Sequence, residues 1–345
     1  MNRLPVSLRL STLCGVIATG TASAAAMTHA VPVLPSRSAA GAPSHGALNQ
    51  PALIAVDSAT ATLEYWAVQR GGSKKPQQLP GSASPLFGLC GYASLVADGV
   101  MVIAAGRNLC TGISNSVLFY NVKTNTTRSL PDPYGIPSDI AIGRNSSLYV
   151  LNGINALSNV AYYPQGSGQP KELVCKKLQA SFYIAADNEG DIFVQGIDTK
   201  NRNSVVEIPA GPGGPQSDHC TRLPLLDEGY ADANGVAVDP KTDDLITVED
   251  TGQCAPSIPV MSIYPKPYSH RSVKTTTLHN RAFCTSGPIR LNADSTIIFY
   301  HDEDLSTNGE IDASVYPGGG TLGVYKDPDD IYPQGFTTIP NTLPN

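Results

Sequence analysis

Little in this sequence of 345 residues favours helices, membranes or strongly charged partners. Only 15% of the residues are charged, and no amphipathic helical run of any length is present. No segment beyond the amino terminus approaches the roughly 20 apolar residues that a membrane span needs. The composition is 41% hydrophobic, with 32 glycines and 28 prolines. These proportions favour short strands joined by tight turns, and they disfavour helical and α/β folds.

The common catalytic and cofactor-binding motifs are also missing. There is no GxSxG elbow, and the glycine-rich stretches at 211–214 and 318–320 lack the following helix that a phosphate-binding loop requires. No two histidines of the region expected to fold stand at HxH or HExxH spacing. These histidines are His219, His270, His279 and His301. The sequence therefore predicts no organic cofactor.

A two-strand phrase recurs along the chain: a short apolar strand, a polar turn and a second apolar strand. The clearest copies lie at 138–150, 182–194 and 235–248. A third strand follows and ends in an aromatic or apolar residue plus proline, as in Tyr163-Pro164 and Tyr264-Pro265, before a weaker fourth strand. A period of roughly 40–55 residues with four strands per unit is typical of propeller blades. We therefore expect an all-β propeller.

The two ends of the repeat region complement each other. The first unit supplies a second, third and fourth strand at 53–56, 63–66 and 77–79, but it has no inner strand. After the last complete unit, residues 332–339 repeat the inner-strand phrase. Pairing of that segment with 53–56 would close a ring and remove two exposed sheet edges. The sequence predicts six blades of four antiparallel strands, each about 48 residues long; a β-sandwich is the alternative fold, but it would not explain the regular period.

The amino terminus resembles an export signal. Arg3 and Arg9 precede an apolar stretch at 10–18, and Ala22-Ser23-Ala24 provides a small-x-small cleavage site. We expect a signal peptide at 1–24, a disordered leader rich in Ala, Ser and Pro at 25–50, and the propeller at 51–345. Cleavage would leave 21 basic against 29 acidic residues, which argues against nucleic-acid binding. The sequence predicts a secreted or periplasmic protein.

Six cysteines would remain after cleavage, and an even number in an exported protein argues for disulfides. In a propeller, the loops that enter the inner strands share a face with the loops that join second to third strands. This topology pairs Cys90 with Cys110 and Cys254 with Cys284, and it leaves Cys175 with Cys220 by elimination. No CxxC is present, so the spacing does not favour a zinc or redox-active site.

Candidate metal ligands stand just before inner strands or just after second strands, so they should lie on that same face. They are Asp139, Asn234, Asp250 and Asp302. Carboxylate and amide oxygens from several blades could hold a hard divalent cation such as calcium, which takes 6–8 oxygen ligands. The alternative is that Asp and Asn occupy these positions because they form turns and satisfy loop backbone groups.

The phrases at 233–239 and 333–336, with Tyr-Pro or Ile-Pro ending the third strands, resemble the NHL-repeat and TolB-like six-bladed propellers of exported bacterial proteins. They are distantly similar to the senescence-marker/gluconolactonase group, which binds a divalent metal through Glu, Asn and Asp. By that resemblance Asn234 matches the Asn-Gly phrase of the group, and Asp139 lies close to its Pro-Asp-Gly phrase. Where the group has Glu-Gly-Pro, this chain has Gln334-Gly335. A neutral amide there would weaken metal binding.

Two functions follow from these observations. The first is a noncatalytic exported scaffold whose loop face binds a protein, glycan or cell-envelope ligand. The second is a metal-dependent lactonase or other hydrolase acting in the channel mouth, where the metal would polarise a carbonyl and activate water. We also expect a monomer, since a closed ring leaves no free sheet edge to drive association.

Overall fold

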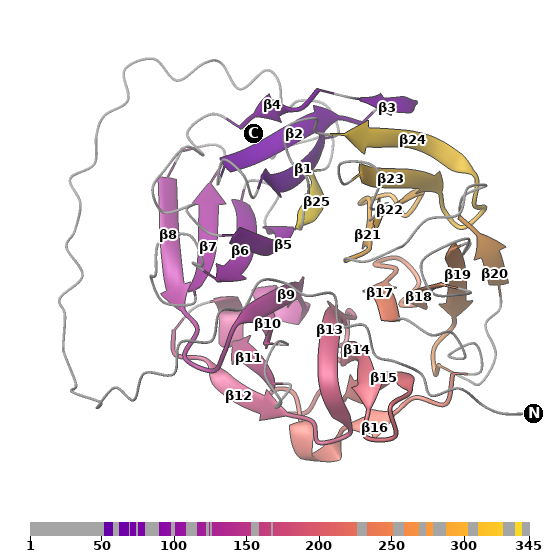
Figure 1. Cartoon of the computed structure of the whole chain (residues 1–345). Coiled ribbons are helices and arrows are strands. Elements are labelled where there is room, and N and C mark those ends of the chain that lie inside the picture. The colour runs from indigo at the N-terminus through magenta and orange to yellow at the C-terminus, as the bar shows by residue number, and fades with distance from the viewer. Residues whose placement is uncertain are drawn as a thin grey trace, which may run out of the picture. The chain divides into compact units, whose positions relative to one another are not determined.

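Strands provide nearly all of the regular structure in the computed structural model (Figure 1). The described residues all belong to the compact unit Pro43–Asn345. The structure describes residues 52–57, 62–68, 70–73, 75–79, 90–97, 101–107, 116–121, 124, 126–152, 159–166, 168–225, 233–250, 259–268, 274–278, 288–302, 310–326 and 335–339. The expected signal peptide and leader lie outside these residues.

The strands are short, and three single turns of 3₁₀ helix separate some of them. In chain order the elements are β1 (Ala52–Asp57), β2 (Thr62–Ala67), β3 (Gly71–Ser73), β4 (Gln77–Gln78), β5 (Cys90–Ala97), β6 (Met101–Arg107), β7 (Ser116–Asn121), β8 (Thr126–Pro131), β9 (Pro137–Ile142), η3 (Arg144–Ser146), β10 (Leu148–Asn152), β11 (Asn159–Tyr163), η4 (Pro164–Gly166), β12 (Lys171–Val174), β13 (Leu178–Ala186), β14 (Ile192–Asp198), β15 (Asn203–Ile208), η5 (Ser217–His219), β16 (Thr221–Arg222), β17 (Ala233–Val238), β18 (Leu245–Asp250), β19 (Pro259–Tyr264), β20 (Lys274–Thr277), β21 (Arg290–Leu291), β22 (Ile297–Asp302), β23 (Glu310–Val315), β24 (Thr321–Lys326) and β25 (Phe336–Ile339).

Within the described residues these strands form six sheets, which we number in chain order. Their strand orders are β25-β1-β2-β4 (sheet 1), β5-β6-β7-β8 (sheet 2), β9-β10-β11-β12 (sheet 3), β13-β14-β15-β16 (sheet 4), β17-β18-β19-β20 (sheet 5) and β21-β22-β23-β24-β3 (sheet 6). The pairing of β3 with β24 is parallel. All other described pairings are antiparallel.

The six sheets follow one another around a common centre, with one edge strand of each facing inward (Figure 1). Strand β25 contacts β5, β5 contacts β9, β9 contacts β13, β13 contacts β17, and β21 contacts β25. This is the arrangement of a β-propeller. The expected all-β propeller with antiparallel sheets is confirmed.

Burial falls from the inner and middle strands to the outer ones. Every residue of β10 and of β11 is buried, because each sheet is covered on both faces by its neighbours. The outer strand β8 has the polar sequence TTRSLP and no buried residue. This gradient explains why the fourth strand of each repeat is the hardest to find in the sequence.

The hydrophobic core is divided into clusters that lie between neighbouring sheets. One cluster joins Phe119 of sheet 2 to Tyr163 of sheet 3, and another joins Val160 of sheet 3 to Ile184 of sheet 4. Further clusters join sheets 4 and 5, sheets 5 and 6, and sheets 6 and 1. Face-to-face packing of adjacent sheets therefore stabilises the assembly.

Sheet 1 combines strands from the two ends of the described chain. Strand β25 pairs with β1 in the register Ala52↔Ile339 to Ala55↔Phe336. The Phe336 side chain is fully buried in the cluster between sheets 1 and 6. The Trp66 indole N–H of sheet 1 donates to the carbonyl oxygen of Lys326 in sheet 6, with 3.2 Å between nitrogen and oxygen.

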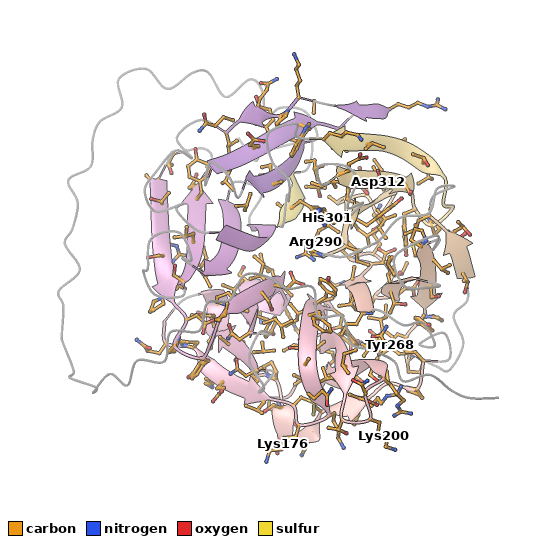
Figure 2. All side chains as sticks on the ribbon, in the orientation of Figure 1. Lys176, Lys200, Tyr268, Arg290, His301 and Asp312 are labelled. Carbon is orange, nitrogen blue, oxygen red and sulfur yellow. A yellow bond between two sulfur atoms is a disulfide. The ribbon has the colours of Figure 1, made fainter. Side chains whose placement is uncertain are left out.

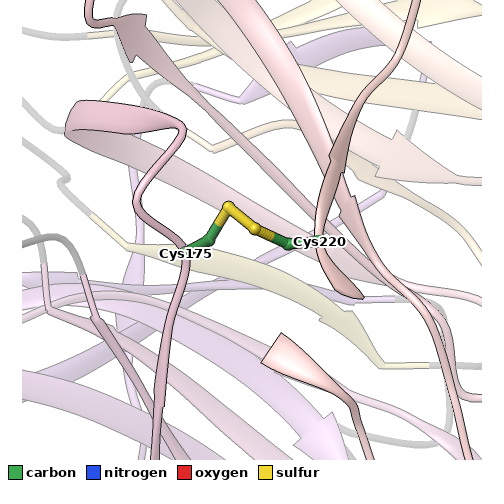
Figure 3. The surroundings of a disulfide bond; sticks show 2 residues. All are labelled: Cys175 and Cys220. Atoms are coloured by element: carbon green, nitrogen blue, oxygen red, sulfur yellow. A yellow bond between two sulfur atoms is a disulfide. The ribbon is translucent and has the colours of Figure 1, made fainter. Parts of the chain in front are cut away.

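A disulfide links the outer parts of sheets 3 and 4. Cys175 follows β12 and Cys220 precedes β16, and their sulfur atoms are bonded (Figure 3). The Cys175–Cys220 pairing predicted from topology is confirmed. The other two predicted pairs stay predictions, since the side chain of Cys90 and all of Cys110, Cys254 and Cys284 lie outside the described structure. In the described part of the chain, no helix has the length and apolarity that a membrane crossing requires.

Candidate functional site

A cavity of about 480 Å³ occupies the centre of the propeller. Five inner strands (β9, β13, β17, β21 and β25) contribute residues to its wall. The aliphatic residues of this wall whose side chains are partly exposed are the last residues of four inner strands, Ile142, Ala186, Val238 and Leu291. The side chains of Ile140, Ile184 and Val236 are at most 1% exposed and pack in the clusters between sheets. At one end the wall continues into the turns that follow the inner strands, with Arg144, Asp187, Asn188, Asp243 and Ala293. The described cavity therefore extends toward the face opposite to the loops where metal ligands were expected.

A buried ion pair crosses the centre near the start of the inner strands. The Nη2 group of Arg290, in sheet 6, donates to Asp139 Oδ1, in sheet 3, over 2.7 Å. Two sheets separate sheet 3 from sheet 6 in either direction around the propeller, so the bridge spans the channel. Figure 2 labels Arg290 near the middle of the ring of sheets.

The Asp139 carboxylate is held by several donors. Oδ1 also accepts the backbone N–H of Ile140 at 2.8 Å, and Oδ2 accepts that of Ile184, in sheet 4, at 2.9 Å. Burial raises the pKa of the Asp139 carboxyl, while the Arg290 charge and the two N–H groups oppose that rise. One side chain thus ties together sheets 3, 4 and 6.

A second polar network joins the turns of sheets 4 and 5. Asp187 Oδ1 accepts the backbone N–H groups of Glu189, Gly190 and Asp191. Its Oδ2 accepts from Lys266 at 2.9 Å and from the Tyr268 hydroxyl at 3.2 Å, both in the segment that follows β19. The Asp187 side chain is fully buried, so these donors replace the water that the charge has lost.

The pKa shifts of Lys266 and Tyr268 show how strongly these side chains interact with the nearby carboxylates. Burial lowers the pKa of Lys266, but hydrogen bonds to Glu189 and Asp187 outweigh burial and hold the pKa well above its ordinary value. Burial, together with the Asp187 charge, raises the pKa of Tyr268. Lys266 is therefore a fixed cation and Tyr268 a fixed hydroxyl donor, and neither is suited to exchange protons near neutral pH.

The structure places the backbones of all four predicted metal ligands within strands or at their ends. Asp139 lies in β9 and Asn234 in β17, while Asp250 and Asp302 are the last residues of β18 and β22. The side chains of Asn234, Asp250 and Asp302 lie outside the described residues. Their metal site stays a prediction.

Asp139 itself does not fit the role of a metal ligand. Its oxygens accept from two backbone N–H groups and a guanidinium, and a cation at the same place would be repelled by Arg290. Among the residues that the structure describes, no group of three or more His, Cys, Asp or Glu side chains could hold a metal ion. We therefore derive no chemical step through a metal.

The sequence reasoning missed Arg290, Lys266 and Tyr268. One signal could have identified Arg290: it is a cation within the otherwise apolar inner-strand phrase Pro288-Ile289-Arg290-Leu291. A buried cation needs an acidic partner, and the inner strands offer Asp139. No comparable signal marks Lys266, because Lys-Pro-Tyr after a strand resembles an ordinary exposed turn.

Comparison with known proteins supports the fold. No protein-family model matches the chain, and no curated protein matches it in sequence. One chain of a nidogen/laminin complex is 12% identical, with a TM-score of 0.62 over 85% of this chain and 99% of that one. TolB from Acinetobacter baumannii is 10% identical, with a TM-score of 0.56 over 84% of this chain and 66% of that one.

The class of protein is therefore a β-propeller that resembles TolB-like propellers in fold. At such identities the likeness shows the fold alone.

Proposed function

We propose that this protein is an exported, noncatalytic propeller that binds a protein, glycan or cell-envelope ligand on the face of the loops leading into the inner strands. The main observation behind this proposal is the ion pair between Arg290 and Asp139. Among the four candidate metal ligands, Asp139 is the one whose side chain the structure describes, and its contacts hold sheets 3, 4 and 6 together. A channel fixed in this way suits a rigid scaffold that presents loops.

The comparisons and the disulfide support this proposal. One similar propeller belongs to a chain of the nidogen/laminin complex, which is an assembly of proteins. The Cys175–Cys220 disulfide is typical of proteins that mature in an oxidising compartment, which favours export.

We further propose that the six sheets are six blades of a closed ring, with β25 as the inner strand of the first. The pairing of β25 with β1 and the Trp66 to Lys326 hydrogen bond support closure. A nearer kinship to the NHL-repeat proteins or to the gluconolactonase group rests on the sequence phrases alone.

The proposal is tested by partner capture with variants on opposite faces. A partner captured from the cell envelope or the culture medium is purified, and its affinity is measured for wild type and two variants. The first variant replaces residues 303–309, between β22 and β23, with a Gly/Ser loop; the second is Asp294→Ala, in the exposed turn on the opposite face. We expect the loop replacement to weaken binding at least tenfold and Asp294→Ala to leave it unchanged.

A metal-dependent lactonase is the competing function, and it makes a separate prediction. Thermal unfolding would be measured in EDTA and then with Ca²⁺, Mg²⁺, Mn²⁺ or Zn²⁺. A ligand that binds only the folded state stabilises it by about 2.7 kcal/mol at 100 times its dissociation constant. The scaffold proposal expects no cation-specific shift; a shift accompanied by lactone hydrolysis, both lost in Asn234→Ala, would overturn it.

A further inference from the structure

Three lysines gather at one end of sheet 4, although the whole chain carries a net charge of −6. Leu178, which begins β13, pairs with Asp198, which ends β14, so the residues just beyond the two strands lie at the same end of the sheet. Lys176 and Lys177 precede Leu178, and Lys200 follows Asp198 by two positions. We call these three residues the lysine cluster. Figure 2 shows Lys176 and Lys200 on the same side of the ring of sheets, away from its centre.

The charges of the lysine cluster are not compensated by its surroundings. All three side chains are exposed, and none of them forms an ion pair with a described residue. The carboxylate at this end of the sheet, Asp198, is only 6% exposed; it is paired with Arg202 at 2.7 Å and lies 3.7 Å from Arg222. One buried negative charge therefore faces two arginines. Exposed charges of one sign that lie close together attract an anionic ligand.

The backbone that presents the lysine cluster is fixed on both sides. Asp198 Oδ1 accepts the backbone N–H of Lys200 at 2.8 Å. Cys175, which is bonded to Cys220, comes directly before Lys176 in the chain. Groups that are already held in place lose less conformational entropy when a ligand binds.

An exposed aromatic ring lies further along the same strand. Phe182 is 39% exposed, and it and Val315 are the two large hydrophobic residues exposed in the described part of the chain. Phe182 falls at the register shift between Ser181 and Tyr183, where β13 leaves the regular ladder. Along β13 it lies within about 13 Å of Leu178, a distance that a chain of a few sugar units can span.

We propose that this end of sheet 4 binds an acidic polysaccharide. Carboxylates of neighbouring sugars lie on the lysine cluster, and one sugar ring stacks on Phe182. Since residues 176–177 lead into an inner strand, this inference rests on the loop-face proposal and names the chemical class of its ligand.

The kinds of side chain present favour a repeating anion. A lysine carries a point charge on a flexible stem, whereas specific recognition of a single carboxylate uses the planar fork of an arginine. The Arg202 fork is already bound to Asp198 through Nε and Nη2. An exposed ring favours sugars over an acidic peptide, because every sugar ring offers C–H groups to the face of an aromatic side chain.

The test measures binding of a purified oligogalacturonate to the full oxidised protein by calorimetry. The same oligosaccharide with methyl-esterified carboxylates is the neutral control, and an oligoglutamate with as many carboxylates is the control without sugar rings. We expect saturable binding of oligogalacturonate that weakens as salt is added, at least tenfold weaker binding of the ester and at least fivefold weaker binding of oligoglutamate. Equal binding of the ester would overturn the role of charge, and equal binding of oligoglutamate would overturn the choice of a sugar. Absence of oligogalacturonate binding would overturn the proposal as a whole.

Two triple variants of equal net charge locate the site. The first replaces all three residues of the lysine cluster with Gln. The control replaces three exposed cations outside sheet 4, by the substitutions Arg70→Gln, Arg144→Gln and Lys241→Gln. We expect at least tenfold weaker oligogalacturonate binding for the first variant and no more than a twofold change for the control. Equal losses in both would show that net charge alone attracts the ligand, and would overturn the site.

A second pair of variants tests the stacking contact. We expect Phe182→Ala to weaken oligogalacturonate binding at least threefold and to leave the weak binding of oligoglutamate unchanged. Val315→Ala is the control, because Val315 is 43% exposed and lies in sheet 6. Unchanged oligogalacturonate binding by Phe182→Ala would remove the reason for choosing a sugar.

The loop-face proposal is tested separately, with a captured partner and the replacement of residues 303–309. The present test uses a purified sugar and variants of sheet 4. Failure of one is therefore distinguishable from failure of the other.

Discussion

At the residue scale, the buried acidic side chains of this protein act as anchors for backbone and neighbouring cations. Asp187 closes its own turn through three N–H groups and then reaches Lys266 and Tyr268 of the next sheet. Asp139 does the same between sheets 3, 4 and 6. Asp187, at the start of a turn, and Asp139, within β9, are therefore explained by their structural contacts before any chemistry is invoked.

Asp198 provides a pH-dependent test of such an anchor. Burial raises the pKa of its carboxyl, but hydrogen bonds from Arg202 and from the backbone of Arg202 and Lys200 outweigh burial and lower the pKa to about 2. A depressed carboxyl pKa contributes stability that is present above the unfolded value of about 3.9 and is lost as pH falls through about 2. Because the Arg202 side chain is 50% exposed, we expect Asp198→Asn to cost only about 1–2 kcal/mol at pH 7.

The measurement is urea unfolding of wild type and Asp198→Asn at pH 7 and near pH 2. The difference between the two proteins should shrink at the lower pH. Asp218→Asn is the control, since the Asp218 side chain is 82% exposed. A cost for Asp198→Asn that is independent of pH would contradict the prediction.

Tyr268 tests the link between sheets 4 and 5. Its hydroxyl lies 3.2 Å from the Asp187 carboxylate and 3.2 Å from the carbonyl oxygen of Asp243, whereas the hydroxyl of the buried Tyr163 donates to the neutral carbonyl of Pro131. Hydrogen bonds to charged groups contribute about 1.5–3 kcal/mol and neutral ones about 0.5–1.5 kcal/mol. Chemical denaturation should therefore show a larger loss of unfolding free energy for Tyr268→Phe than for Tyr163→Phe. The reverse order would mean that Lys266 satisfies the Oδ2 atom of Asp187 without the Tyr268 hydroxyl.

At the element scale, periodicity predicts the middle strands well and the irregular ones poorly. The predicted phrase at 182–186 is the end of β13, which begins at Leu178. Register shifts between Leu178 and Ala180 and between Ser181 and Tyr183 break the alternation of buried and exposed residues. Alternation is the signal on which the prediction depends, so the first half of β13 could not be found.

A glycine in β14 marks the position of these irregularities. A Cβ atom on Gly196 would overlap the carbonyl oxygen of Ala180 and lie 2.8 Å from the Ser181 Cα atom. Both obstacles are backbone, which cannot rotate away. We expect Gly196→Ala to destabilise the fold by about 1–3 kcal/mol, the usual cost of overpacking.

Gly213→Ala is the matched control for this prediction, because nothing lies within 4 Å of its added methyl group. Thermal unfolding of both variants tests the prediction, and Gly196→Ala should unfold at a lower midpoint temperature than Gly213→Ala. Equal midpoints would show that β13 relaxes away from β14 at little cost.

At the scale of the whole molecule, the sequence predicted the propeller class from its repeat but could not predict which residues meet across the centre. Asp139 was identified as a polar residue at the start of an inner strand, yet its partner Arg290 lies 151 residues later and in a sheet that is not adjacent. Repeat patterns specify contacts within a blade and with the next blade. They carry no information on side chains that span the channel, so the ion pair required the structure.

The contacts that join the first and last sheets could likewise be predicted from the sequence only in part. The inner-strand phrase at 332–339 predicted a partner for 53–56, and in the structure β25 pairs with β1. The parallel pairing of β3 with β24 had no sequence signal beyond Gly71-Gly72. Parallel pairing of a three-residue strand with a distant one leaves no periodicity to detect.

Gly71 and Gly72 allow a test of how much β3 contributes to the stability of the whole molecule. Both have positive φ, +87° for Gly71 and +74° for Gly72, so alanine strains the backbone at either position. The two positions differ in the room that they leave for an added methyl group. A methyl group on Gly71 meets nothing within 4 Å, whereas one on Gly72 overlaps the backbone of Val324 in β24. We expect Gly72→Ala to cost about 1–3 kcal/mol more than Gly71→Ala in urea unfolding.

Loss of the β3–β24 pairing should also expose the outer edge of sheet 6, and unpaired strand edges promote association between molecules. Size-exclusion chromatography at increasing concentration should show more self-association for Gly72→Ala than for Gly71→Ala. If the two variants unfold and elute alike, β3 contributes little to the joining of sheets 1 and 6. The pairing of β25 with β1 and the Trp66 to Lys326 hydrogen bond would then provide that joining.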